Sequence, residues 1–141
     1  MSPGASDFVW PVRVYWEDTD AGGIVFYANY LKFFERARTE WLRHLGVEQQ
    51  ALRQDTGGMF VVSATEMRYL RSARLDDVLS IRTDLAQAGR ASMVLQQSAW
   101  RRDGNAETCL CEGVIRIGWV EAESLKPGRI PSTVLDRLRP S

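Results

Sequence analysis

In NYLKFFERARTEWLRHL, residues 29–45, the apolar side chains recur at spacings of three and four, and this segment determines the architecture expected of the whole chain. This period predicts one long amphipathic helix from about Asn29 to Leu45. Asn29 is the expected N-cap and Gly46 the expected stop. A stripe this rich in aromatic residues needs a broad apolar surface to lie against, and a β-sheet supplies one. The stripe comprises Tyr30, Phe33, Phe34, Ala37, Trp41 and Leu45.

The residues before this helix follow a different period. Residues 10–17, WPVRVYWE, place Val12, Val14 and Trp16 on one face, as a strand does. The next six residues, DTDAGG at 18–23, hold two short carboxylates and two glycines, which is typical of a turn. The chain is therefore expected to leave a strand, turn and enter the helix.

Beyond the helix the sequence predicts a weaker helical segment, four strands and a short final helix. Gly57 and Gly58 separate the weaker helical segment from the strands, and Asp103-Gly104-Asn105 is a strong hairpin signal. The expected bounds are 47–54 for the helical segment, 59–70, 78–86, 91–100 and 107–120 for the strands, and 131–138 for the final helix.

Sequential strands joined by tight turns form a meander, so we expect an antiparallel sheet that carries the long helix on one face. The fold class is α+β. Residues 1–141 are expected to form one domain, with 1–8 as a flexible leader.

Length and charge exclude several classes of protein. A chain of 141 residues fits one domain and can bury a core without a disulfide or metal. Its 18 basic and 18 acidic residues give no net charge, so it lacks the field of a nucleic-acid or anionic-membrane binder. Only Lys32 and Lys126 among the basic residues are lysine, and an excess of arginine suits phosphate and carboxylate recognition.

The few histidine and cysteine residues exclude further chemistry. His44, Cys109 and Cys111 make a poor zinc site, and a catalytic triad would have to use His44 as its base. Cys109 and Cys111 point to the same side of a predicted strand, which favours two core thiols over a disulfide. The start, MSPGASDF, does not resemble a signal peptide, and no stretch approaches the ~18 apolar residues of a membrane span. A cytoplasmic protein is expected.

The junction of turn and helix, residues 18–30, is the best candidate for chemistry. A glycine-bearing loop that enters a helix exposes backbone N–H groups beside the positive end of the helix dipole, where an oxyanion can bind. A carboxylate on the same loop, Asp18 or Asp20, adds a base or nucleophile, so such a site can hydrolyse an activated acyl group without histidine or metal. The plain alternative is that both aspartates only cap turns.

Residues 14–46, VYWEDTDAGGIVFYANYLKFFERARTEWLRHLG, resemble the signature of the hotdog-fold acyl-CoA thioesterases of the 4-hydroxybenzoyl-CoA thioesterase class. The likeness is greatest to the Tol-Pal-associated, YbgC-like members. It continues through residues 61–81, VVSATEMRYLRSARLDDVLSI, and into the last strand. It implies a hotdog fold, in which an antiparallel sheet of about five strands wraps around one long central helix.

The resemblance also implies roles for single residues. Asp20, the second aspartate of DTD, matches the family's catalytic aspartate, which acts as nucleophile or general base. The backbone N–H of Tyr27 matches the oxyanion donor, and Gly22 and Gly23 would allow the thioester to approach closely. Arg90 matches a position that contacts the phosphates of CoA. Weaker phosphate candidates are Arg71, Arg74 and Arg129. For each of the four arginines the alternative is a solvated surface charge.

Two positions depart from the family pattern. Some YbgC-like members carry histidine where this chain has Tyr27, so a role for the Tyr27 side chain is in question. Many relatives have proline where this chain has Ser72, which should be a structural matter.

Three other polar residues have plain interpretations. Glu35 lies in the region where other hotdog thioesterases place a catalytic glutamate, but an ion pair with Arg38 is favoured. Asp18 is favoured as a loop cap, and His44, near the helix end, as a surface residue.

These observations predict an acyl-CoA thioesterase that releases a free acid and CoA. CoA is part of the substrate, so no separate cofactor and no metal are expected. The resemblance implies a homodimer or homotetramer with the active site across a subunit interface, and it makes Tol-Pal-related or acyl-carrier-protein contacts candidate partners. Two alternatives remain: a non-enzymatic acyl-CoA or acyl-carrier binding module, and a hotdog dehydratase. A hotdog dehydratase uses a catalytic histidine near the central helix, and His44, the one histidine of this chain, lies at the wrong end of the predicted helix.

Overall fold

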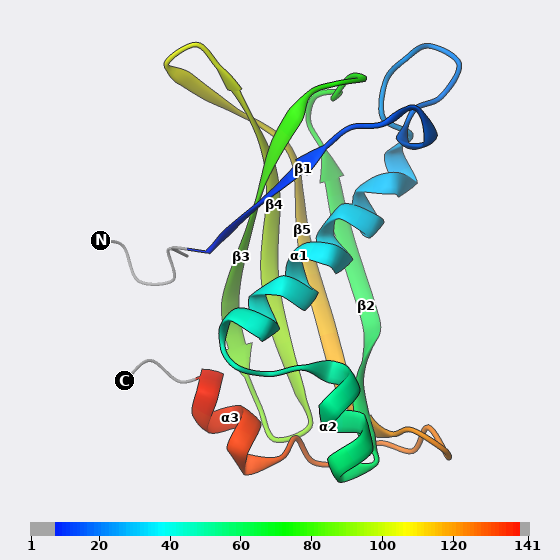
Figure 1. The fold of residues 1–141 in the computed structure, drawn as a ribbon, viewed down its shortest axis with the longest axis vertical. Coiled ribbons are helices and arrows are strands. Elements are labelled where there is room, and N and C mark those ends of the chain that lie inside the picture. Colours follow the sequence, from blue (N-terminus) through cyan, green and yellow to red (C-terminus); the bar gives the residue numbers. More distant parts are fainter. Residues whose placement is uncertain (1–7, 139–141) are drawn as a thin grey trace.

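The structure, a computed structural model, describes residues 8–138. The predicted leader, residues 1–8, lies outside the described residues except for Phe8. The described chain forms a five-stranded antiparallel sheet with one long helix on its concave face and two short helices at one end (Figure 1).

The strands appear in the order β1-β3-β4-β5-β2 across the sheet. Only β3, β4 and β5 form a meander, because β2 pairs with β5 and lies at the sheet edge opposite β1. The expected four-strand meander is therefore wrong. Alternation along a strand shows which side chains share a face, but it does not identify the neighbouring strand. The bounds are Val9–Arg13 for β1, Gly58–Tyr69 for β2, Val78–Ala88 for β3, Ser92–Asp103 for β4 and Ala106–Glu121 for β5.

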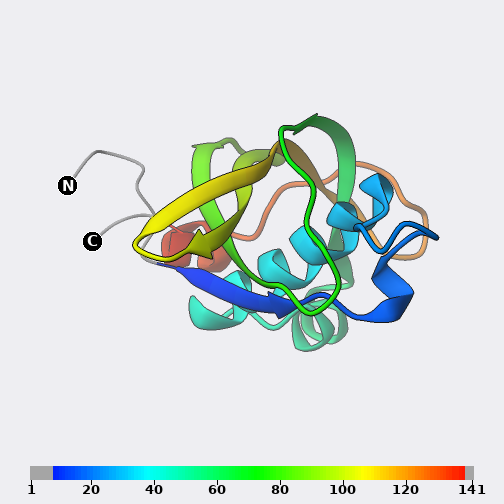
Figure 2. The same ribbon diagram turned by 90° about the horizontal axis from the view of Figure 1, so that it is seen from above.

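Helix α1, Tyr30–His44, crosses the sheet, which curves around it when seen from above (Figure 2). Its apolar stripe is buried as predicted, and Phe33, Phe34 and Ala37 are fully excluded from solvent. Burial of each large side chain contributes roughly 1.5–3 kcal/mol, so this stripe anchors α1 to the sheet. The described residues thus confirm a long helix wrapped by an antiparallel sheet.

The C-terminal end of α1 agrees with the sequence prediction, and the N-terminal end does not. Gly46 ends the helix as expected, with a left-handed φ of 85°. Asn29 does not cap it, because the chain enters α1 through a 3₁₀ turn, Tyr27–Asn29, in which Asn29 already has helical backbone angles. Trp16, expected on the same strand face as Val12 and Val14, is 73% exposed, because β1 ends at Arg13.

The short helices α2, Gln49–Thr56, and α3, Ser132–Leu138, lie at the end of the sheet remote from the start of α1 (Figure 1). Among residues 8–138, no helix is long and apolar enough to cross a membrane. Cys111 is buried in the core and Cys109 is half-buried, and both are free thiols.

Candidate active site

Asp18 anchors the turn that precedes α1. Its side chain is buried, and its carboxylate accepts hydrogen bonds from the Tyr15 backbone N–H at 2.9 Å and from Asn29 Nδ2 at 2.6 Å. Hydrogen bonds to a charged acceptor contribute about 1.5–3 kcal/mol each. Asp18 is therefore a cap, as predicted, and it fixes where α1 begins relative to β1.

Asp20 lies two residues further on and is exposed. Its Oδ1 accepts a hydrogen bond from the Gly22 backbone N–H at 2.8 Å, and its backbone closes the turn by bonding to Ile24 and Gly23. No hydrogen bond from another described residue reaches Oδ2. The side chain is thus held by one oxygen, while the other remains available to a ligand.

Gly22 and Gly23 are each favoured in this turn, but for different structural reasons. A Cβ at Gly22 would lie 3.3 Å from Asp20 Oδ1, so a side chain there would press on the carboxylate. Gly23 has a φ of 78°, in the left-handed region that favours glycine. Because neither glycine carries a side chain, the backbone beside Asp20 is accessible to a ligand.

The amide of Tyr27 is the other component of the site. Tyr27 is the first residue of the 3₁₀ turn that leads into α1, and its N–H donates to no backbone oxygen of the described residues. N–H groups at a helix start lack internal partners and lie at the positive end of the helix dipole. The junction therefore presents a carboxylate and an unused donor on one short segment.

A cleft of about 370 Å³ opens beside this segment. Rings from three elements meet along it: Tyr69, at the end of β2, lies 5.7 Å from the Tyr27 ring and 5.9 Å from the Tyr30 ring. The volume suits a small organic ligand. Its lining residues are Asp20, Ile24, Val25, Phe26, Tyr27, Tyr30, Tyr69, Leu70, Arg71 and Ser72.

Two phenols of this cleft, those of Tyr30 and Tyr69, are poor acid–base groups at neutral pH. Burial raises the pKa of Tyr30, whose hydroxyl accepts a hydrogen bond from the Ala73 backbone N–H at 3.3 Å. Burial also raises the pKa of Tyr69. The carboxylate of Asp20 is therefore the group best suited to proton transfer or nucleophilic attack in the cleft.

Sequence reasoning did not single out Tyr69. The alternation of β2 places Tyr69 and Met67 on one face, but it does not indicate that β2 ends beside the start of α1. Arg71, a weaker phosphate candidate, lines the cleft.

Arg90 lies elsewhere. It follows β3, which begins at Val78, six residues after Ser72 of the cleft lining, and the 11 residues of this extended strand span roughly 35 Å. There the Arg90 carbonyl accepts a hydrogen bond from the Ile130 N–H at 2.7 Å, next to Arg129. The chain therefore does not bring Arg90 to its own Asp20.

The other polar residues on α1 are not part of the cleft. The expected close ion pair between Glu35 and Arg38 does not form, because Arg38 points to the sheet and donates to Gln97 Oε1 at 2.9 Å, although the Glu35 charge still interacts with Arg38. Burial there lowers the pKa of Arg38. Glu35 instead accepts from the Thr39 hydroxyl at 3.4 Å. His44 is exposed at the far end of α1, against the ring of Phe8.

No group of three or more potential metal ligands occurs in the described part of the chain.

Residues 22–108 match the family model described as "Thioesterase superfamily". The chain is 44% identical over 129 residues to the acyl-CoA thioester hydrolase YbgC of Escherichia coli O6:H1, covering 91% of this chain and 92% of that protein. It is 39% identical over 127 residues to the acyl-CoA thioesterase YbgC of Haemophilus influenzae, covering 90% of each.

The fold has close solved counterparts. The 4-hydroxybenzoyl CoA thioesterase from Pseudomonas sp. strain CBS-3 superposes with a TM-score of 0.83, covering 92% of this chain and 96% of that one, at 21% identity. That likeness concerns the fold alone. Together with the family match, it confirms the predicted hotdog fold.

Proposed function

This chain belongs to the thioesterase superfamily, and from that premise we propose that it is an acyl-CoA thioester hydrolase whose reaction takes place at Asp20. The observation that carries the proposal is the pairing of a half-free Asp20 carboxylate with the unused Tyr27 amide at the mouth of the cleft.

The reaction adds one water to the thioester carbonyl and breaks the C–S bond. Asp20 either takes a proton from the attacking water or attacks the carbonyl itself, forming an anhydride that water then hydrolyses. In both routes the sulfur leaves as a thiolate and is protonated to the thiol of CoA. The products are the free acid and CoA.

The Tyr27 N–H stabilises the oxyanion that forms when the carbonyl is attacked. A single well-placed donor is worth about 2.7–4 kcal/mol in such a transition state. Gly22 and Gly23 present no side chain that would keep the thioester away from this donor. The phenol of Tyr27 is not required in this scheme.

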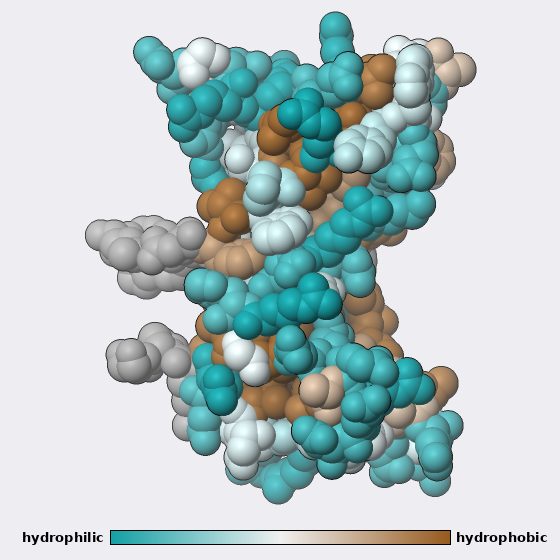
Figure 3. Space-filling model, viewed as in Figure 1, coloured by the Kyte–Doolittle hydropathy of each residue, from teal (hydrophilic) through white to brown (hydrophobic). Residues whose placement is uncertain are grey.

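We further propose that the active enzyme is a dimer, or a dimer of dimers, in which Arg90 of the partner subunit binds the phosphates of CoA. β2 is an edge strand of 12 residues, and Val62 and Tyr69 on its inner face are 49% and 45% exposed. Figure 3 shows hydrophobic surface open to solvent along the right-hand edge of the molecule, where β2 lies in Figure 1. An edge strand of this kind is a template for pairing with another chain.

Antiparallel pairing of two β2 strands around a twofold axis explains the remote position of Arg90. The Gly58 end of one β2 would then lie beside the Tyr69 end of the other. Arg90 lies at the Gly58 end of the sheet, so the partner subunit's Arg90 would approach this chain's cleft. Each cleft would combine Asp20 from one subunit with a cation from the other.

The cytoplasmic location and contacts with acyl-carrier protein or Tol-Pal components stay predictions. A carrier-bound acyl group presents the same thioester, so the same chemistry would apply to it.

The test is a panel of acyl-CoA thioesters with release of free thiol as the readout, run on the wild type and on Asp20→Asn. Thiol release that Asp20→Asn abolishes supports the proposal. Binding of acyl-CoA without turnover would instead identify a binding module. Hydration of an unsaturated acyl-CoA without thiol release would identify a dehydratase, although His44 lies far from the cleft.

A further inference from the structure

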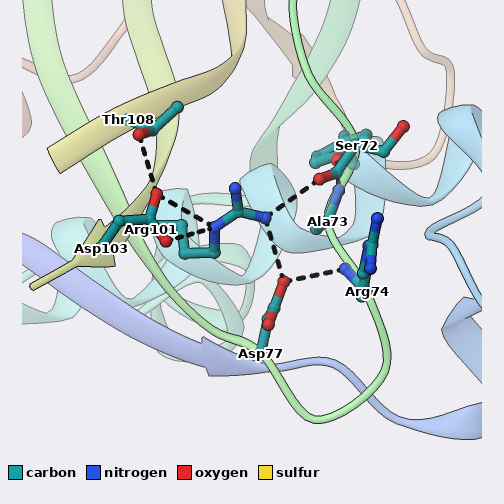
Figure 4. Close-up of polar contacts among 8 residues, drawn as sticks. Ser72, Ala73, Arg74, Asp77, Arg101, Asp103 and Thr108 are labelled. Carbon is teal, nitrogen blue, oxygen red and sulfur yellow. Dashed lines mark hydrogen bonds and ion pairs between the residues drawn. The ribbon is translucent and has the colours of Figure 1, made fainter.

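Arg101 connects the β4–β5 hairpin to the loop of residues 70–77 (Figure 4). It extends from β4, and its NH1 donates to the Ser72 carbonyl at 3.2 Å and to Asp77 Oδ2 at 3.4 Å. Its Nε donates to Asp103 Oδ1 at 3.1 Å, and Asp103 in turn accepts from the Thr108 hydroxyl at 2.9 Å. Asp103 of the β4–β5 hairpin therefore fixes the position of the guanidinium, and the guanidinium in turn fixes the loop of residues 70–77 through Ser72 and Asp77.

The 70–77 loop supports both components of the site. The Ala73 carbonyl accepts from the Val25 N–H at 2.8 Å, and the Leu75 N–H donates to the Gly23 carbonyl at 3.2 Å. The Ala73 N–H donates to the Tyr30 hydroxyl, which lines the cleft. Gly23 and Val25 lie between Asp20 and Tyr27, so a shift of this loop would move the turn that carries both.

Asp77 adds a second connection to this loop. Its Oδ2 accepts from the Arg74 N–H at 2.9 Å as well as from Arg101. The Asp76 backbone between them has a left-handed φ of 72°, a conformation that persists only where surrounding contacts hold it. The loop thus depends on a few polar contacts, because Ala73 is its one fully buried residue.

The Arg101 contacts differ from an ordinary surface ion pair. The side chains of Arg101 and Asp77 are only 24% and 25% exposed, so water competes weakly with their hydrogen bonds. Arginine presents several donors in a rigid fork, whereas lysine is a point charge on a flexible stem. Only arginine can bind Ser72, Asp77 and Asp103 at once in this geometry.

We propose that Arg101 is a positioning residue for the reaction: by binding Ser72, Asp77 and Asp103 together, it fixes the 70–77 loop and thereby the relative placement of Asp20 and the Tyr27 amide. This inference rests on the proposed thioesterase function. It predicts that loss of Arg101 lowers kcat rather than the affinity for acyl-CoA, because Arg101 contacts the cleft lining only at the backbone carbonyl of Ser72 and does not contact Arg90, the residue proposed to bind the phosphates of CoA.

The experiment compares Arg101→Gln and Arg101→Lys with Arg102→Gln. Arg102 is the next residue, is exposed, and lies 3.8 Å from Glu107 outside this network, so it controls for loss of a positive charge on the same strand. Hydrogen exchange of the Val25 and Leu75 amides is measured together with kcat and KM, at a temperature well below unfolding of every variant.

We expect both Arg101 variants to exchange faster at Val25 and Leu75 than the wild type and to lose at least about tenfold in kcat, with KM little changed, since small misplacements of reacting groups have effects of this size. Arg102→Gln should match the wild type in all measurements. Unchanged exchange, or unchanged kcat in a folded Arg101→Gln, would overturn the inference. If the wild type hydrolyses no acyl-CoA, the proposed function fails, while the exchange data still decide whether Arg101 orders the turn.

Discussion

Asp18 and Asp20 lie two residues apart on one turn and face opposite environments. Asp18 is 4% exposed and accepts two hydrogen bonds, whereas Asp20 is exposed and accepts one from Gly22. The first carboxylate is used up by the fold, and the second keeps an oxygen for a ligand. This division agrees with the proposal that Asp20, and not Asp18, is the catalytic carboxylate.

Asp20→Asn should abolish most of the activity and leave the fold intact. An amide is neither a base nor a useful nucleophile, so kcat should fall by about 10²–10⁴-fold. The side chain is exposed, so the free energy of unfolding should change by no more than about 0.5 kcal/mol. Thiol release and urea denaturation measure the two effects. Near-normal turnover would rule out Asp20 as the catalytic group.

Asp18→Asn should have the reverse effect. The asparagine NH₂ would face the Tyr15 N–H or Asn29 Nδ2, leaving a buried donor unpaired, and the free energy of unfolding should fall by about 1–3 kcal/mol. Urea denaturation checks this, with the exposed neighbour Glu17→Gln as the control. A variant with normal stability and strongly reduced kcat would instead make Asp18 part of the catalytic machinery.

The sequence predicted this turn and α1 well because both depend on neighbours along the chain. The period of Phe33, Phe34 and Ala37 sets the buried face of a helix wherever it packs, and the glycines mark the turn locally. The cleft could not be predicted in the same way. Tyr69 reaches Tyr27 only because β2 lies beside β5 rather than beside β3, and strand alternation contains no information about that choice.

Arg101 illustrates the same limit. Asp103 is a local partner two residues along β4, but Ser72 and Asp77 reach Arg101 only when the sheet is assembled. Asn29 shows a local limit instead. It is a good N-cap residue by type, but the buried carboxylate of Asp18 takes its side-chain amide.

Substitution of Tyr27 can separate its amide from its side chain. Tyr27→Phe should leave kcat within a few-fold of wild type. Tyr27→Pro removes the N–H, and the backbone of Phe26, at φ −63° and ψ 129°, suits a following proline. Loss of the oxyanion donor should lower kcat by roughly 10²–10³-fold.

Tyr27→Ala is the matched control, because it also lacks the ring but keeps the N–H. The difference in kcat between the proline and alanine variants measures the amide alone. Equal kcat values for these two variants would show that the Tyr27 N–H is not the oxyanion donor.

Stability should fall at high pH because of Cys111. Burial raises its pKa to about 12 from 9.0, with Cys109 and Glu112 adding to the shift. Between these values the unfolded chain has lost the thiol proton and the folded chain has kept it, so the free energy of unfolding decreases as pH rises from about 9 to 12. Below that range Cys111 adds no pH dependence.

Urea denaturation across this range, compared with Cys111→Ala, isolates the effect. The alanine variant should show a shallower decline, because other groups, such as Tyr30, titrate in both proteins. Parallel curves for the two proteins would contradict a raised thiol pKa. A thiol reagent should not label Cys111 in the folded wild type and should label it once the protein is unfolded.

The composite site can be tested by mixing inactive subunits. Asp20→Asn removes the proposed catalytic carboxylate, and Arg90→Glu should raise KM for acyl-CoA by repelling its phosphates. Each variant alone should hydrolyse acyl-CoA more slowly than the wild type. For Arg90→Glu the loss should be clearest at substrate concentrations far below the wild-type KM. In a heterodimer of the two, one cleft would carry both substitutions and the other neither, provided that Asp20 and Arg90 come from different subunits.

Co-expression of the two variants should therefore restore about a quarter of the wild-type activity, because random assembly makes half of the dimers mixed and each mixed dimer has one intact site. If Asp20 and Arg90 served the same subunit, every site would contain one substitution, and mixing would restore nothing. Val62→Lys, which places a charge on the exposed β2 edge, should yield monomers by light scattering and prevent the restoration. Recovery of activity by monomeric subunits would contradict the shared site.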